Sequence, residues 1–113
     1  MHEMSIAMNI LEIAEQNASD SGSSVINSIE VEIGTLAGIE LSSLSFCFET
    51  ARKSTRLAQS AKLEIISIAA VGKCADCNID AKADFYHALC PECGQPVAVS
   101  GGRDLRVKSI NVD

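Results

Sequence analysis

The sequence predicts an α+β fold in which two helices pack on a three-stranded sheet and a four-cysteine module is inserted before the last strand. Three observations lead to this prediction. Apolar residues recur at helical spacing in two segments, and three other segments are rich in apolar residues at strand-like spacing. Four of the five cysteines lie in a remaining segment that has neither period. The order is helix, strand, helix, strand, cysteine module, strand.

Two segments are predicted to be helical. In the first, from Met4 to about Asn17, apolar residues lie on one line with a second line beside it, and the polar run 18–24 ends the helix as a loop. In the second, from Glu40 to about Ser54, a single apolar face recurs, and Ser42 or Ser43 is the expected N-cap. The apolar lines are Met4, Ala7, Leu11 and Ala14, then Ile6, Ile10 and Ile13, and in the second helix Leu41, Leu44, Phe48 and Ala51.

Three segments are predicted to be strands. Residues 25–34 alternate apolar and polar side chains, which is typical of a half-buried strand. Residues 62–70 are more continuously apolar, which favours an interior strand. Residues 104–112 alternate as well, but the alternation changes phase at Ser109, so we expect a bulge or a change of neighbour there.

Composition narrows the function classes. The chain has 113 residues, of which 47% are hydrophobic and 21% charged, so a compact core is expected. The formal net charge of −6 disfavours a primary role in nucleic-acid binding, because such proteins neutralise phosphates with Lys and Arg. No basic segment follows Met1 and no apolar run approaches the roughly 18 residues of a spanning helix, so we expect a cytoplasmic protein with reduced thiols.

The strongest motif is a pair of Cys-x2-Cys turns. Cys74 and Cys77 form the first turn, Cys90 and Cys93 the second, and twelve residues separate the two. Two such turns closing on each other supply the four thiolates that a tetrahedral structural Zn²⁺ takes. Four thiolates leave no open position, so the motif predicts a structural, zinc-ribbon-like site rather than a catalytic one.

Details around these cysteines leave alternatives open. A redox Cys-x2-Cys pair or an Fe–S cluster competes with zinc, although redox motifs come as a single pair. We expect Gly72 and Gly94 to form the turns beside the thiols, and Phe85 and Tyr86 to cover the site.

Two further side chains near or outside the motif have alternative interpretations. His87 is either a substitute ligand or a solvated loop residue. Cys47, on the apolar face of the second helix, is interpreted as a small buried hydrophobe rather than a reactive thiol.

The amino terminus offers a second chelating group. The Met1 amine, the His2 backbone nitrogen and the His2 ring can close fused rings around one ion, and Glu3 can add a fourth donor. Nitrogen-rich planar sites favour Ni(II) or Cu(II). The plain alternative is that His2 is a solvated terminal residue and Glu3 an acidic first-turn residue favoured by the helix dipole.

With these two features at this spacing, the chain resembles the HypA/HybF family of hydrogenase maturation factors, which are nickel metallochaperones. The resemblance covers essentially the whole chain, and the Met-His-Glu start combined with the double Cys-x2-Cys motif is its specific part. The matching stretches are Met-His-Glu-Met-Ser at 1–5, Val-Glu-Ile-Gly at 31–34, Ser-Phe-Cys-Phe-Glu at 45–49, Cys-Ala-Asp-Cys at 74–77, Leu-Cys-Pro-Glu-Cys-Gly at 89–94, and Leu-Arg-Val-Lys-Ser-Ile at 105–110.

The resemblance implies a nickel-binding α/β domain, residues 1–70 plus 102–113, and an inserted zinc-binding domain, residues 71–101. Nickel would be held by His2, Glu3 and the Met1 amine, with Glu40 a further candidate because some relatives carry an acidic residue, Asp, at its place. The implied metals are structural zinc and transported nickel.

The implied partners are a HypB-type GTPase nickel chaperone and the precursor of the [NiFe]-hydrogenase large subunit, or urease in some organisms. The expected protein is a monomer or homodimer and not an enzyme. Two rival functions are a zinc-ribbon interaction or nucleic-acid module, which leaves the Met-His-Glu start unexplained, and a metal-dependent hydrolase, for which two histidines are too few.

Overall fold

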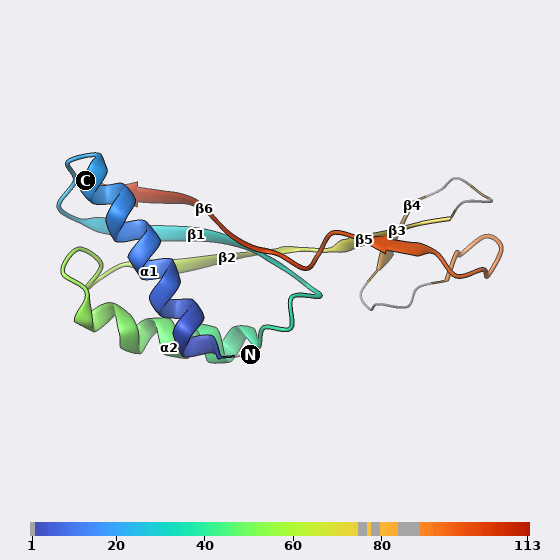
Figure 1. Ribbon diagram of the computed structural model, residues 1–113, viewed down its shortest axis with the longest axis horizontal. Helices are drawn as coiled ribbons and strands as arrows, with labels where there is room; N and C mark the ends of the chain where they lie inside the picture. Colours follow the sequence, from blue (N-terminus) through green and yellow to red (C-terminus); the bar gives the residue numbers. More distant parts are fainter. Residues whose placement is uncertain (1, 75–76, 78–79, 84–88) are drawn as a thin grey trace. The chain divides into compact units, whose positions relative to one another are not determined.

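The computed structural model describes residues 2–74, 77, 80–83 and 89–113 (Figure 1). The elements in chain order are α1 (Glu3–Asp20), β1 (Ile26–Gly34), α2 (Leu41–Ala51), a 3-10 turn (Arg52–Ser54), β2 (Lys62–Ile68), β3 (Ala70–Lys73), β4 (Asp80–Ala83), β5 (Ala98–Ser100) and β6 (Leu105–Val112). The strands form two three-stranded sheets, in the orders β2-β1-β6 and β4-β3-β5. The predicted α+β fold, with two helices and a cysteine module before the last strand, is confirmed.

The chain divides into two compact units. Unit 1 comprises Met1–Val31, Ile39–Ile66 and Arg106–Asp113, and unit 2 comprises Glu32–Gly38 and Ser67–Leu105. Unit 1 contains both helices and most of the first sheet, and unit 2 contains the second sheet and the four clustered cysteines. The predicted domain limits, 1–70 plus 102–113 and 71–101, stay a prediction.

The core of unit 1 lies between the helices and the first sheet. Buried side chains come from one face of α1, from one face of α2 and from alternate positions of β1, as the helical and strand periods require. They include Ala7, Ile10, Leu11 and Ala14 of α1, Leu44 and Phe48 of α2, and Ile29 and Val31 of β1.

The order of the first sheet corrects one prediction. β1 is the central strand, although its sequence alternates, and β2, the more apolar segment, is an edge strand. Ile65 and Ile66 of β2 are only half-buried and Ile68 is exposed. A continuous apolar run marks an interior strand only where a sheet is covered on both faces.

The first helix is longer than predicted. α1 continues through Asp20 because Gly22, with φ of +73°, ends it in a left-handed turn, where the Ser23 amide donates to the Ala18 carbonyl. Met4 and Ile13, predicted on the apolar lines, are exposed. The buried stripe of α1 is therefore narrower than the apolar residues suggested.

The start of the second helix also differs from the prediction. The N-cap of α2 is Glu40 rather than Ser42 or Ser43. A carboxylate oxygen of Glu40 accepts from the Ser42 amide at 3.2 Å, which satisfies one of the amides left free at a helix start. In β6 the exposed pair Lys108 and Ser109 confirms the predicted change of phase.

Unit 2 contains a sheet that was not predicted. β3 pairs antiparallel with β4, Lys73 opposite Asp80, and antiparallel with β5, Lys73 opposite Ala98. Gly72, predicted in a turn, lies inside β3 and is buried.

Unit 2 also contains a close crossing of backbone segments. The Leu36 amide donates to the Gly102 carbonyl at 2.6 Å and the Thr35 amide donates to the Ile68 carbonyl at 2.9 Å. A side chain on Gly34 would overlap the backbone of Gly102, so glycine permits this approach.

Candidate metal centre

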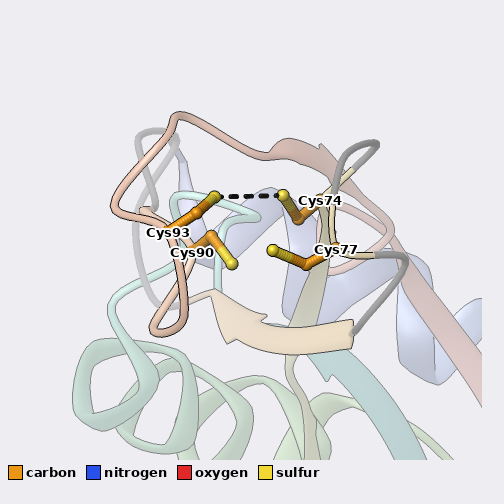
Figure 2. Close-up of side chains that lie close together, drawn as sticks. All are labelled: Cys74, Cys77, Cys90 and Cys93. Atoms are coloured by element: carbon orange, nitrogen blue, oxygen red, sulfur yellow. Dashed lines mark hydrogen bonds between the residues drawn. The ribbon is translucent and has the colours of Figure 1, made fainter.

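The four cysteines of the double motif lie together in unit 2 (Figure 2). Their sulfur atoms are all within 4.8 Å of one another, and the sulfurs of Cys74 and Cys93 are 3.6 Å apart. Ligands at about 2.3 Å from a tetrahedral Zn²⁺ are separated by about 3.8 Å. The cluster therefore fits the donor number, donor type and spacing of a zinc ion.

Local backbone structure presents each pair of thiols. Cys74 directly follows β3, and its side chain is buried. At the second pair, the Gly94 amide donates to the Cys90 carbonyl and the Cys90 amide donates to the Gln95 carbonyl, both at 2.8 Å. Gly94 has a φ of +73°, so the turn predicted at this glycine is confirmed. A bridge between Leu89 and Pro96 closes the loop around the second pair.

Hydrogen bonds shift the pKa values of two of the clustered thiols in opposite directions. Hydrogen bonding with the Cys93 side chain, together with burial, raises the pKa of Cys77 to about 12. Backbone hydrogen bonds from Cys93 and Glu92 lower the pKa of Cys90 to about 7. The thiols of Cys77 and Cys90 therefore ionise with very different ease, and a divalent ion among the four would supply the charge that makes four thiolates stable together.

Three of the residues predicted to bind nickel, His2, Glu3 and Glu40, lie in the described part of the chain. His2 is exposed, adopts an extended conformation just before α1, and accepts through its carbonyl from the Ile6 amide at 3.2 Å. Glu3 begins α1, and its Oε2 atom accepts from the Glu40 amide at 3.3 Å. The start of α1 and the start of α2 therefore meet within unit 1, and Glu40 lies beside Glu3.

Sequence reasoning missed the partner of Glu40. The Ser42 hydroxyl donates to both carboxylate oxygens of Glu40, at 2.6 and 2.8 Å. These hydrogen bonds lower the pKa of Glu40 below its usual value. The signal was available, because a carboxylate two residues before a serine at a helix start is an ordinary capping arrangement.

The remaining sequence predictions concern Cys47 and four residues near the two proposed metal sites. Cys47 is half-buried rather than buried, because it lies at the margin of the α2 core face. Met1, Phe85, Tyr86 and His87 lie outside the described residues. The Met1 amine as a ligand, the aromatic cover of the cysteines and His87 as a substitute ligand therefore stay predictions. No helix in the described part of the chain is long and apolar enough to cross a membrane.

The helices on a sheet, joined to a module that clusters four thiols, define a small α+β metal-binding protein. The family model described as "Hydrogenase/urease nickel incorporation, metallochaperone, hypA" matches residues 1–112. The chain therefore belongs to the HypA family, whose members are maturation factors and metallochaperones rather than enzymes. The resemblance noted in the sequence is confirmed.

Similar proteins cover the chain at full length. The hydrogenase maturation factor HypA of Chlorobium luteolum is 41% identical over 100% of this chain and 97% of its own length, and that of Chlorobaculum parvum is 39% identical over 100% of both. The solution structure of the Ni metallochaperone HypA from Helicobacter pylori matches with a TM-score of 0.70, at 24% identity over 99% of this chain and 97% of that one. A second HypA solution structure matches at 25% identity and a TM-score of 0.69, over 99% of this chain and 96% of that one. At this identity, the likeness to the Helicobacter pylori structure shows the fold alone.

Proposed function

We propose that this protein carries Ni(II) at its amino terminus and delivers it for the maturation of [NiFe]-hydrogenase, while zinc on Cys74, Cys77, Cys90 and Cys93 holds unit 2 in shape. The observation that carries the proposal is the match to the HypA family over residues 1–112, in a chain that begins Met-His-Glu.

The nickel ligands in this proposal are the His2 ring and backbone nitrogens, the Met1 amine and Glu3. Nitrogen donors in a planar array suit Ni(II). The hydrogen bond from the Glu40 amide to the Glu3 carboxylate supports the proposal, because it brings the start of α2 to Glu3, the residue that follows the exposed His2. Glu40 is the weaker candidate, since its carboxylate already accepts from Ser42.

A carrier must bind its cargo selectively and still release it. A site at an exposed terminus, built from one side chain and backbone nitrogens, needs little rearrangement when a partner takes the ion. The recipients would be a HypB-type GTPase and the hydrogenase large-subunit precursor, with urease as a further recipient, and the compartment would be the cytoplasm, where thiols stay reduced.

The test is nickel titration of the chain with an unextended amino terminus, compared with His2→Ala. We expect the variant to lose most of its nickel affinity, and a tag before Met1 to weaken binding by blocking the amine. Glu15→Gln, which removes a carboxylate elsewhere on α1, should bind nickel normally. Equal nickel binding by the native and His2→Ala proteins, with equal zinc content, would remove the amino-terminal site.

The same titration separates the two carboxylates. Glu3→Gln should weaken nickel binding if the side chain is a ligand. Glu40→Gln should leave nickel binding nearly unchanged if the carboxylate only caps α2. A loss in Glu40→Gln as large as that in Glu3→Gln would make Glu40 a ligand.

A further inference from the structure

The strongest unexplained surface feature is a groove between α1 and α2. It has a volume of about 680 Å³ and lies wholly within unit 1. Its lining comes from one face of α1 and from the end of α2 with the turn that follows. The lining residues are Met4, Met8, Leu11, Glu12, Glu15, Gln16, Ser19, Thr50, Ala51, Ser54 and Thr55. We call this feature the methionine groove.

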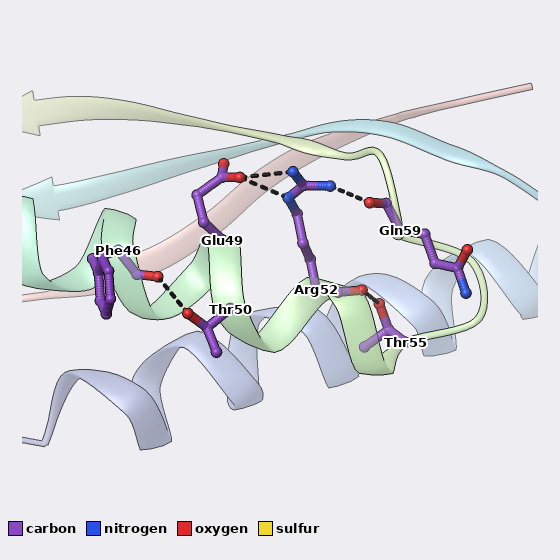
Figure 3. Close-up of polar contacts among 6 residues, drawn as sticks. All are labelled: Phe46, Glu49, Thr50, Arg52, Thr55 and Gln59. Atoms are coloured by element: carbon purple, nitrogen blue, oxygen red, sulfur yellow. Dashed lines mark hydrogen bonds and ion pairs between the residues drawn. The ribbon is translucent and has the colours of Figure 1, made fainter.

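The two methionines that line the methionine groove are exposed to solvent. Met8 is 58% exposed and Met4 is 40% exposed, while Leu11 below them is buried. Phe46, 73% exposed, lies one helical turn before Thr50 on the same side of α2 (Figure 3). Methionine side chains adapt to the shape of a partner, so exposed methionines are frequent at surfaces that bind helices.

The charges of the methionine groove restrict its occupant. Glu12 and Glu15 are its only charged lining residues, and no Lys or Arg is among the described residues that line it. The formal net charge of the chain is also negative, −6, although the turn after α2 carries Arg52 and Lys53 next to the lining residues. An anionic membrane surface or a nucleic acid would be repelled, whereas a segment with Lys and Arg would be attracted.

Neither α-helix of a second copy of this chain supplies such a segment. Neither α1 nor α2 contains a Lys or an Arg, so another copy would present further acidic or neutral helix surface. The groove follows α1 from Met4 to Ser19, about four helical turns, which is the length over which a docked helix places its i, i+3, i+4 and i+7 anchors.

We propose that the methionine groove binds a basic amphipathic helix of a partner protein, with apolar anchors on Met4, Met8 and Leu11 and cationic side chains facing Glu12 and Glu15. The proposal is independent of the nickel site, because it uses neither His2 nor Glu40.

The first test is an NMR titration of the full chain with an 18-residue helical Leu/Lys peptide, and with a control peptide that has Glu in place of Lys. We expect shift changes at Met8, Leu11, Thr50 and Ala51 with the first peptide only. Met8→Gln should weaken binding about three- to tenfold, and Glu12→Lys with Glu15→Lys about tenfold or more. Ile13→Gln, which changes an exposed apolar residue of α1 outside the groove, should bind normally.

Two results would overturn the proposal. Shift changes spread over the other acidic surfaces, with no effect of Met8→Gln, would mean that the peptide is attracted by net charge alone. Sedimentation showing a homodimer that Met8→Gln dissociates would assign the groove to a second copy.

A photo-crosslinker at position 8 then tests the partner in cells of the source organism. We expect cross-linked peptides with Lys or Arg at helical spacing, whereas an acidic segment or an absence of cross-links would overturn the proposal. Nickel affinity should be unchanged in Met8→Gln, so a failure of this proposal is distinguishable from a failure of the nickel site.

Discussion

The two units of this chain differ in the buried side chains that stabilise each of them. Among the described residues, the largest fully buried side chains belong to unit 1 with a single exception, and that exception is a cysteine, Cys74. Among the described residues of unit 2, Leu36 and Ala70 form a small buried cluster with Val99 packed against them, and Ile33 is buried as well. Among the described residues, unit 1 therefore contributes most of the large buried apolar side chains, and we expect unit 2 to depend more on a metal held by its cysteines.

Under the proposed function, each metal would bind where its role requires. A structural site contributes folding free energy directly, so its ion must stay bound. A transported ion must leave, so it is better placed where folding does not depend on it. The clustered cysteines lie in unit 2, where the described residues contribute few large buried side chains, and the exposed His2 lies just before α1 in unit 1, which contributes most of them.

Loss of the proposed zinc site should have the largest effect on stability. In Cys74→Ser we expect zinc binding to be lost and unit 2 to unfold, because a structural zinc contributes about 10–16 kcal/mol in small zinc domains. Unit 1 should keep its structure. The measurement is zinc content together with amide NMR spectra, and dialysis of the native chain against a chelator should reproduce the variant.

The outcome that contradicts this comparison is specific. If unit 2 amides stay dispersed in the zinc-free protein, apolar burial around Leu36 and Ala70 is sufficient for that unit. If unit 1 also loses its structure, the two units do not have separate sources of stability.

The reciprocal change is Phe48→Ala. Phe48 is fully buried in α2, so its truncation should lower the free energy of unfolding of unit 1 by about 3–5 kcal/mol. Zinc content and the NMR signals of unit 2 should be unchanged. Denaturant unfolding followed by helical circular dichroism measures the loss.

A matched control for this change lies two residues away. Phe46→Ala removes the same side chain from a position that is 73% exposed, and should change unfolding by no more than about 0.5 kcal/mol. Similar losses in the two variants would mean that Phe48 is not a core residue of unit 1.

The sequence predicted the parts of this fold that local patterns determine. Helical spacing located α1 and α2, alternation located β1 and β6, and two matched Cys-x2-Cys turns located the thiol cluster. Each of these signals is contained in a short stretch of chain, and each is a pattern that one kind of structure imposes.

Three features needed the structure because their causes are not local. β3, β4 and β5 are only 4, 4 and 3 residues long, which is too short for a period to emerge. The central place of β1 depends on its pairing with β2 and β6, which lie far from it in the sequence. The contact of Glu3 with Glu40 joins residues 37 apart, and nothing in either segment encodes it.

A smaller effect is expected at the backbone crossing of unit 2. Gly102 has a φ of +68°, and a Cβ atom there would lie 2.7 Å from the backbone nitrogen of Ala70. Gly102→Ala should therefore destabilise unit 2 by about 2–4 kcal/mol, through left-handed strain and steric overlap together. Hydrogen exchange at the Leu36 amide, which donates to Gly102, measures the loss.

The neighbouring Gly101 allows left-handed strain to be measured separately from steric overlap. Gly101 has a φ of +71°, but nothing lies within 4 Å of its added Cβ atom. Gly101→Ala should cost only the strain, about 1–2 kcal/mol. Equal losses at the two glycines would mean that the crossing relaxes around a methyl group, and that unit 2 is less tightly constrained there than its geometry indicates.

The smallest effect is expected at the polar end of α2 (Figure 3). Arg52 donates through Nε and Nη2 to Glu49 Oε2, at 2.9 and 2.7 Å, and through Nη1 to the Gln59 carbonyl. The Glu49 side chain is 56% exposed, so solvent screens the pair. Arg52→Ala should lower the stability of unit 1 by about 1 kcal/mol or less, measured by the same denaturant unfolding as Phe48→Ala.

Two companion variants make this weak effect informative. Arg52→Lys should lose nearly as much as Arg52→Ala, because an ammonium group cannot keep the two-pronged contact with Glu49 and the bond to Gln59 together. Glu49→Gln should lose less, since the contact with the Gln59 carbonyl remains. A loss at Arg52 that equals the loss at Phe48 would mean that unit 1, like unit 2, depends on a few directed contacts rather than on its apolar core.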